Sequence, residues 1–241
     1  MAVKYAEIAE SLSASRLKTY RVGLSVAESA LHTSEAVKAY YLLNDISQHF
    51  FMPLQLVEVV LRNRLNNHIH NLTGKATWYD SVPAMLKTKD AVIKAKQVAK
   101  EEVENPTPDD IVCRLTFGFW ANLLDSSQRD SAKPDHFIWD QHDFKKVFLG
   151  ADGTLKVGIA SMRLLKVNGL RNRLFHHEPI WKSKRVNSLA SAIGCLEHQY
   201  QDLTEVLGWL SPEMLALFKA WGFEGRLKLA CDAARFDRGL W

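Results

Sequence analysis

The spacing of apolar residues predicts helices along nearly the whole chain. Apolar residues recur at intervals of three and four, which places them on one face of a helix. The clearest stripe lies within residues 53–72 and consists of Leu54, Val57, Leu61 and Leu65. No segment shows the alternation and turn residues of a β-hairpin. We therefore predict an all-α fold.

The same spacing predicts further helices over residues 35–47, 87–104, 186–207 and 212–221. Thr107 and Pro108 are typical of a helix start, and the helix that follows should continue through Leu123. Another helix should begin near Thr154 and end near Glu178, because Pro179 disfavours helical geometry in the residue before it. We expect residues 126–143 to be polar and irregular, and residues 1–241 to form one domain.

Composition restricts the class of protein only broadly. The 241 residues are 47% hydrophobic and 24% charged, with 31 basic and 27 acidic residues and a net charge of +4. This surplus permits nucleic-acid binding but does not require it. The three cysteines are far apart and form no Cys-x-x-Cys pair, which argues against a disulfide framework or a cysteine zinc site. With no signal-peptide core and no membrane-spanning apolar run, we predict a cytoplasmic protein without a membrane partner.

The segment LRNRLFHHEPIW, residues 170–181, concentrates reactive side chains at the predicted end of a helix. Asn172 and His176 are four residues apart and share a face, and Arg171 lies one position away. Histidine near a helix C-terminus and beside a permanent cation suits an anionic reacting group such as phosphate. The segment is our candidate active site.

Cleavage of RNA without a metal needs a base for the 2′-hydroxyl, an acid for the leaving oxygen, and cations for the phosphorane. On a helix, Arg171 and His176 point about 140° apart, so one motif converges poorly on one phosphate. Two motifs across a two-fold axis would supply two histidines and two arginines. The spacing therefore favours a composite site in a homodimer.

The motif residues also carry a family resemblance. Arg-Asn-x-x-x-His followed by His-Glu-Pro-Ile resembles the signature of Abi-like (abortive infection) proteins of the HEPN superfamily. Further segments match in the family's order: 56–63, Trp78, 117–120 and 209–213. The resemblance implies a HEPN-like helical bundle, here with additional N- and C-terminal helices. It also implies a metal-independent endoribonuclease without a cofactor, whose composite site is built by two copies of the motif.

The resemblance further implies roles for single residues. Arg171 and His176 would be the catalytic pair, with Asn172 as the usual polar residue between them. We assign proton transfer to His176, transition-state charge to Arg171, and orientation of His176 to Asn172. The implied biology is phage defence or toxin-like growth arrest through RNA cleavage. Such a toxin would need restraint, either by a protein or RNA antitoxin or by activation only on infection.

Neighbouring residues have more than one interpretation. His177 either assists or is an exposed histidine, and Glu178 more readily pairs with a basic residue than acts as a base. Glu58, Arg62 and Asn63 match the resemblance in the N-terminal half, where LRNRL also occurs as residues 61–65. They form a helix salt bridge, support the Arg171 helix or contact RNA.

Basic residues after the motif are candidates for contact with a phosphate backbone, or simply for a solvated helix start: Lys182, Lys184 and Arg185. We expect His68 and His70, near a predicted helix end, to face solvent.

Two other functions compete with the nuclease. One is a catalytically inactive HEPN-type module that binds RNA or protein. The other is a metal hydrolase, for which the dense group is His136, Asp140, His142 and Asp143. No His-Glu-x-x-His string supports the metal site, so we predict no metal and no cofactor.

Overall fold

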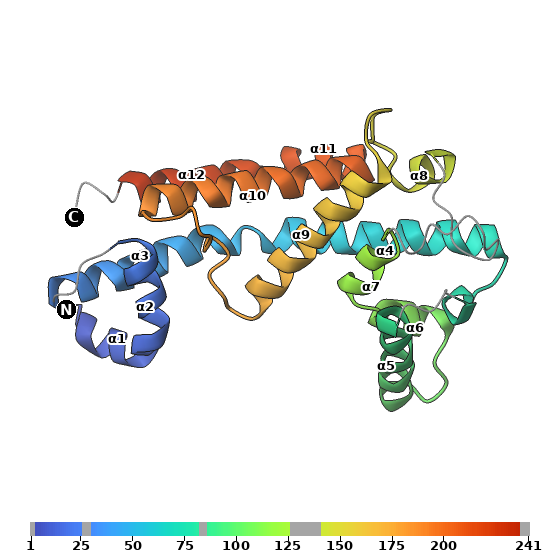
Figure 1. The fold of residues 1–241 in the computed structure, drawn as a ribbon, viewed down its shortest axis with the longest axis horizontal. Coiled ribbons are helices and arrows are strands. Elements are labelled where there is room, and N and C mark those ends of the chain that lie inside the picture. The colour runs from blue at the N-terminus through green and yellow to red at the C-terminus, as the bar shows by residue number, and fades with distance from the viewer. Residues whose placement is uncertain (1–2, 26–29, 82–85, 126–140, 237–241) are drawn as a thin grey trace. The chain divides into compact units, whose positions relative to one another are not determined.

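The computed structural model describes residues 3–25, 30–81, 86–125 and 141–236, and these residues form helices without any strand (Figure 1). The all-α prediction is confirmed. The helices are α1 (Tyr5–Leu12), α2 (Ala14–Gly23), α3 (Ala30–Gln48), α4 (Phe51–Thr73), the 3₁₀ helix η1 (Trp78–Ser81), α5 (Leu86–Glu102), α6 (Pro108–Arg114), α7 (Phe117–Asn122), α8 (Gln141–Val147), α9 (Val157–Phe175), α10 (Leu189–Leu210), α11 (Pro212–Ala220) and α12 (Phe223–Phe236).

The chain divides into two compact units. The terminal unit contains residues 1–53, 172–202 and 216–241, and the central unit contains residues 54–171 and 203–215. The boundaries fall inside α4, α9, α10 and α11. Each unit is therefore built from segments that are distant in the sequence. The single domain that we expected over residues 1–241 stays a prediction.

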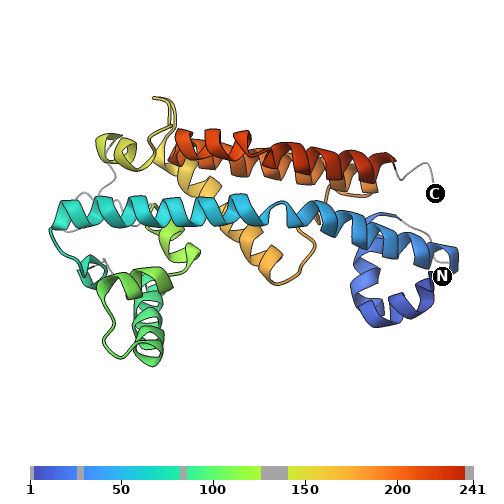
Figure 2. The ribbon, with the colours of Figure 1, turned by 180° about the vertical axis from the view of Figure 1, so that it is seen from behind.

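The terminal unit is organised around α3. Helices α1, α2 and α12 all pack against α3. Helices α1 and α2 are drawn in dark blue beside α3 in both ribbon views (Figures 1 and 2). Phe50 packs edge-on against Tyr200 at a centroid distance of 5.3 Å. Arg235 of α12 pairs with Glu197 of α10, which joins these two helices at their exposed edge. The N-terminal helices α1 and α2 and the C-terminal helix α12 thus gather on α3, and the Arg235–Glu197 pair connects α12 to α10.

The central unit is built on α4. The four leucine and valine side chains of the predicted stripe are each at most 1% exposed, so they are core residues as the pattern indicated. Trp78 and Trp120 are fully buried and lie 5.8 Å apart between ring centroids. Trp78 Nε1 donates to Asn66 Oδ1 of α4 at 2.8 Å. These aromatic residues anchor the core, because a buried tryptophan needs both apolar contact and an acceptor for its N–H group.

One predicted helix is two helices. The segment expected to run from Pro108 to Leu123 ends at Arg114 and restarts at Phe117. Thr116 adopts extended backbone, and its side chain accepts a hydrogen bond from Phe119 N. This capping residue starts a new helix where the apolar spacing alone had indicated continuity.

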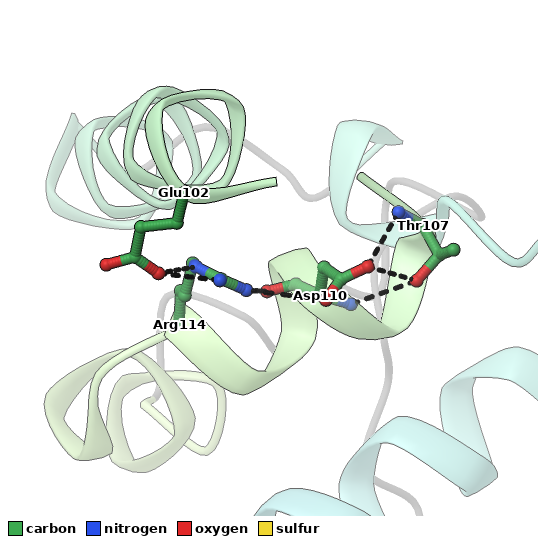
Figure 3. Close-up of polar contacts among 4 residues, drawn as sticks. All are labelled: Glu102, Thr107, Asp110 and Arg114. Atoms are coloured by element: carbon green, nitrogen blue, oxygen red, sulfur yellow. Dashed lines mark hydrogen bonds and ion pairs between the residues drawn. The ribbon is translucent and has the colours of Figure 1, made fainter. Parts of the chain in front are cut away.

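The start of α6 is a capping box, as Figure 3 shows. Thr107 and Asp110 accept hydrogen bonds from each other's backbone N–H groups. The hydrogen bonds from Thr107 lower the pKa of the Asp110 carboxyl below its ordinary value. Arg114 at the other end of α6 reaches Glu102 of α5 at 2.6 Å. The short helix is therefore fixed at both ends.

The polar segment 126–143 is described only from Gln141 onward, and residues 126–140 lie outside the described residues. Helix α8 begins at Gln141, so the last three residues of the segment are helical and not irregular. Further along, Gly150 N donates to Trp209 O at 2.9 Å. A Cβ atom at Gly150 would lie 2.0 Å from Gly208 O, so this close approach requires glycine.

In the part of the chain that the structure describes, no helix combines the length and apolar character needed to cross a membrane.

Candidate functional site

Helix α9 ends in a Schellman motif, the C-terminal turn in which the last N–H groups fold back onto free carbonyls. His177 N donates to Leu174 O at 3.0 Å, and Glu178 N donates to Arg173 O at 2.8 Å. His177 has a φ of 56°, in the left-handed region where glycine is usual. The helix therefore ends at Phe175, three residues before the end that we predicted near Glu178.

This ending changes the expected surroundings of both histidines. His176 N donates to Asn172 O at 2.9 Å, so His176 keeps helical register as the capping residue. His177 has already left the helix. The free carbonyls of Asn172, Arg173 and Leu174 thus accept hydrogen bonds from backbone N–H groups. We had expected both histidines to lie in the last turn, where free carbonyls favour a protonated imidazole.

Arg173 holds the loop that follows the helix. Its guanidinium donates to Pro179 O, to Ile180 O at 3.4 Å and to Lys182 O at 3.3 Å. It also pairs with the Glu178 carboxylate at 3.8 Å. The Glu178 partner that sequence left open is therefore a basic residue, and one arginine fixes the course of residues 178–182.

Helix α2 of the terminal unit contacts the same loop. Arg16 Nη1 donates to His177 O at 2.7 Å. The buried Trp181 ring packs edge-on against Tyr20, with a centroid distance of 5.3 Å. Gly23 admits this ring closely, since a Cβ atom there would lie 3.1 Å from Trp181 Cη2. From α10, Gln199 Nε2 donates to Ile180 O at 3.1 Å.

These anchors hold the end of the motif from both sides, and sequence reasoning missed all of them. Arg16 and His177 are 161 residues apart, so no local pattern connects them. Arg173 stood inside the motif, but its spacing resembled an ordinary helix surface. The only available signal was Trp181, an apolar anchor directly after the reactive side chains.

Arg171 belongs to the central unit and pairs with Glu58 of α4 there. Arg171 Nε lies 3.4 Å from Glu58 Oε2, and both side chains are partly exposed, at 33% and 26%. A pair of this exposure contributes on the order of 1 kcal/mol or less. The pair therefore contributes little to stability, and its main effect is to orient the Arg171 guanidinium toward Glu58. Of the roles left open for Glu58, this contact favours support of Arg171.

Arg62 and Asn63 lie on the same helix as Glu58, next to each other. Arg62 Nε donates to Asn63 Oδ1 at 3.2 Å, at an exposed position. The second copy of LRNRL thus has its own local contact, while the Glu58 carboxylate faces Arg171 across to α9.

The remaining predicted site residues all face solvent: Asn172, His176, His177, Glu178, Lys182, Lys184 and Arg185. Exposure leaves the imidazole of His176 accessible to a large substrate. The basic residues after Trp181 lie in the connection to α10, where a polyanion can approach them.

Metal ligands do not converge within the described part of the chain, where no three His, Cys, Asp or Glu side chains gather. Three members of the rival metal group, His136, Asp140 and the side chain of His142, lie outside the described residues. The fourth, Asp143, lies 3.2 Å from Lys146 Nζ and 3.7 Å from His68 Nε2.

Comparisons of the chain with models of protein families, with curated proteins and with solved structures gave no significant match. The resemblance to Abi-like proteins therefore depends on the motif residues themselves.

Proposed function

We propose that this protein is a metal-independent endoribonuclease of the HEPN type, acting as a homodimer. The observation that carries the proposal is the motif at the end of α9, where an exposed histidine follows an arginine that a carboxylate orients. The Schellman motif, Arg173 and Arg16 give that end a fixed course. A site that transfers protons requires such fixed positions.

In the proposed reaction, His176 of one protomer removes the proton from the 2′-hydroxyl. The 2′-oxygen attacks the adjacent phosphorus, and the bond to the 5′-oxygen breaks. His176 of the second protomer donates a proton to the leaving 5′-oxygen, and Arg171 binds the phosphoryl oxygens as negative charge accumulates. The products are a 2′,3′-cyclic phosphate and a 5′-hydroxyl.

Glu58 is a positioning residue in this scheme. Its carboxylate accepts from Arg171 before RNA binds, and the phosphate replaces it as an acceptor afterwards. The exposed Asn172 lies one helical turn before His176, beside the path of the substrate. Lys182, Lys184 and Arg185 bind the flanking phosphates.

The exposed face of α9 supports self-association. Ile159, Met162 and Leu165 recur every three residues in the central unit and are 44%, 61% and 40% exposed. Gly169 follows on this helix with open space above it. An exposed apolar stripe of this kind marks an interaction surface, and a second copy is the occupant that a composite site requires.

The proposed biology follows the resemblance. Cleavage of cellular or viral RNA would arrest growth during infection, in the cytoplasm. A protein or RNA antitoxin would restrain the enzyme between infections.

The test is cleavage of a mixed panel of structured RNAs in excess EDTA. Wild type should cut the RNA and leave 2′,3′-cyclic phosphate ends, while Arg171→Ala and His176→Ala should lose at least about a hundredfold in rate. His198→Ala is the matched control, because this histidine is 76% exposed on α10. Intact RNA with the wild-type dimer, or full activity of both motif variants, contradicts the proposal.

The dimer has its own test. Met162→Glu should give a monomer without cleavage, while Leu217→Glu, at an equally apolar exposed position on α11, should change neither property. Sedimentation measures the association and the RNA panel measures the activity. A monomeric wild type that cuts RNA would contradict the composite site.

A catalytically inactive RNA-binding module is the second candidate, and the exposed cluster of Lys182, Lys184 and Arg185 favours it. In that case no variant cuts RNA, His176→Ala binds RNA like wild type, and neutralising the three cations weakens binding.

A further inference from the structure

A solvent-open pocket of about 510 Å³ lies between α4 and α8 in the central unit. Its volume falls in the range of small-molecule sites, which is roughly 300–1,000 Å³. The lining residues are Arg64, Asn67, His68, Asn71, Leu72 and Lys146. None of them is a residue of the proposed nuclease site.

The α4 side of the pocket is a polar stripe. Arg64, Asn67, His68 and Asn71 recur at the three- and four-residue spacing that places side chains on one helix face. His68 is only 8% exposed, so our expectation that it faces solvent was wrong. The physical reason is that α8 packs beside it, and the Asp143 carboxylate lies 3.7 Å from His68 Nε2. On this face of α4, His68 is thus buried and Arg64 is partly buried, while Asn67 and Asn71 face solvent.

The charges in the pocket favour an anionic ligand. Arg64 Nε is buried and has no acceptor among the described residues. A buried donor without an acceptor is destabilising, and an arginine donor especially so. Lys146 Nζ lies 3.2 Å from Asp143 Oδ1 and remains partly exposed. Arg64 and Lys146 thus bring two cationic side chains to the lining of the pocket, and no carboxylate is among its lining residues.

We propose that this pocket binds the phosphate group of a nucleotide. Arginine presents a fork of donors to phosphate oxygens, and lysine adds a mobile point charge. The carboxamides of Asn67 and Asn71 offer both donors and acceptors to a base or ribose. Leu72 supplies an apolar contact for the base. The phosphate belongs either to a free nucleotide or to RNA, and the proposal does not rest on the nuclease.

The test measures binding by calorimetry to AMP, to inorganic phosphate and to a short RNA with and without a 5′-phosphate. Wild type should bind at least one nucleotide probe, and Arg64→Met and Lys146→Gln should each weaken this binding at least about tenfold. Lys145→Gln is the matched control, since Lys145 is the exposed neighbour on α8 and does not line the pocket. Asp143→Asn removes the opposing charge and should tighten binding.

The folding of Arg64→Met separates a ligand-binding arginine from a structural one. Replacing a buried donor that lacks an acceptor should leave the unliganded melting temperature unchanged or raise it, while binding is lost. Tight binding of AMP would identify the ligand as a free nucleotide. Binding of RNA but not of AMP would identify it as an RNA phosphate. No binding to any probe, or equal binding by wild type, Arg64→Met and Lys146→Gln, overturns the proposal.

Discussion

Replacing Arg173 by methionine should release the loop that carries the end of the motif. Methionine keeps much of the apolar stem and removes the guanidinium. Three carbonyl oxygens, of Pro179, Ile180 and Lys182, lose this donor. Ile180 O keeps Gln199 as a second donor, so it is not left unsatisfied.

The size of the effect follows from the contacts. A hydrogen bond to a charged donor contributes about 1.5–3 kcal/mol, and less when it is long or exposed. The bonds to Ile180 O and Lys182 O exceed 3.2 Å, and the pair with Glu178 is at 3.8 Å with its carboxylate 58% exposed. We therefore expect a loss of about 3 kcal/mol in the free energy of unfolding. For a chain of this size the melting temperature should fall by about 6–12 °C.

Urea unfolding measures the global effect, and limited trypsin digestion measures the local one. Lys182, Lys184 and Arg185 are tryptic sites directly after the anchored residues, so cleavage there should accelerate. Arg173→Lys keeps the charge but offers fewer fixed donors, and should lie between wild type and Arg173→Met. Lys184→Met is the surface control and should stay within about 0.5 kcal/mol of wild type. An unchanged unfolding curve together with an unchanged digestion rate for Arg173→Met would show that Arg173 does not anchor the loop.

Three other positions have sharp expected outcomes. His177→Gly should raise the free energy of unfolding by about 0.5–1 kcal/mol, because glycine accepts the positive φ without strain; a loss of stability in urea would contradict this. Gly150→Ala should cost at least about 3 kcal/mol in thermal unfolding, since its Cβ would overlap Gly208 O, and a near-neutral result would rule out the close approach. Asp110→Asn should destabilise the protein near pH 7. The lowered pKa of Asp110 means that its contribution to stability is complete above the ordinary carboxyl pKa and disappears as the pH falls through the lower, folded value. Wild type and variant should therefore converge in strong acid, and a constant difference there would contradict the assignment.

The core residues of α4 were predictable because the spacing of apolar residues within one helix is enough to identify them. Leu54, Val57, Leu61 and Leu65 are spaced for one helix face, and that spacing is independent of the rest of the fold. Capping residues refined this pattern: Thr107 was recognised, whereas Thr116 was hidden inside an apolar run and split the expected helix.

The helix end at the motif was less predictable. Pro179 indicated a stop, but the Schellman motif ends α9 earlier and uses histidine where glycine is the usual signal. The Glu58–Arg171 pair and the Arg16–His177 bond join segments more than a hundred residues apart. Such contacts are properties of the tertiary fold, so single-sequence spacing carries no information about them.

The anchoring of the motif also bears on the order of events during synthesis. The loop from His177 to Lys182 is tethered by Arg16 of α2 and by Gln199 of α10. Translation runs from the N-terminus, so Arg16 is synthesised first, the end of α9 much later, and Gln199 last. The helix end that carries His176 therefore acquires its full set of tethers only late in translation. Under the proposed nuclease function, an unfinished chain therefore lacks part of the support of His176 while the message that encodes it is still being read.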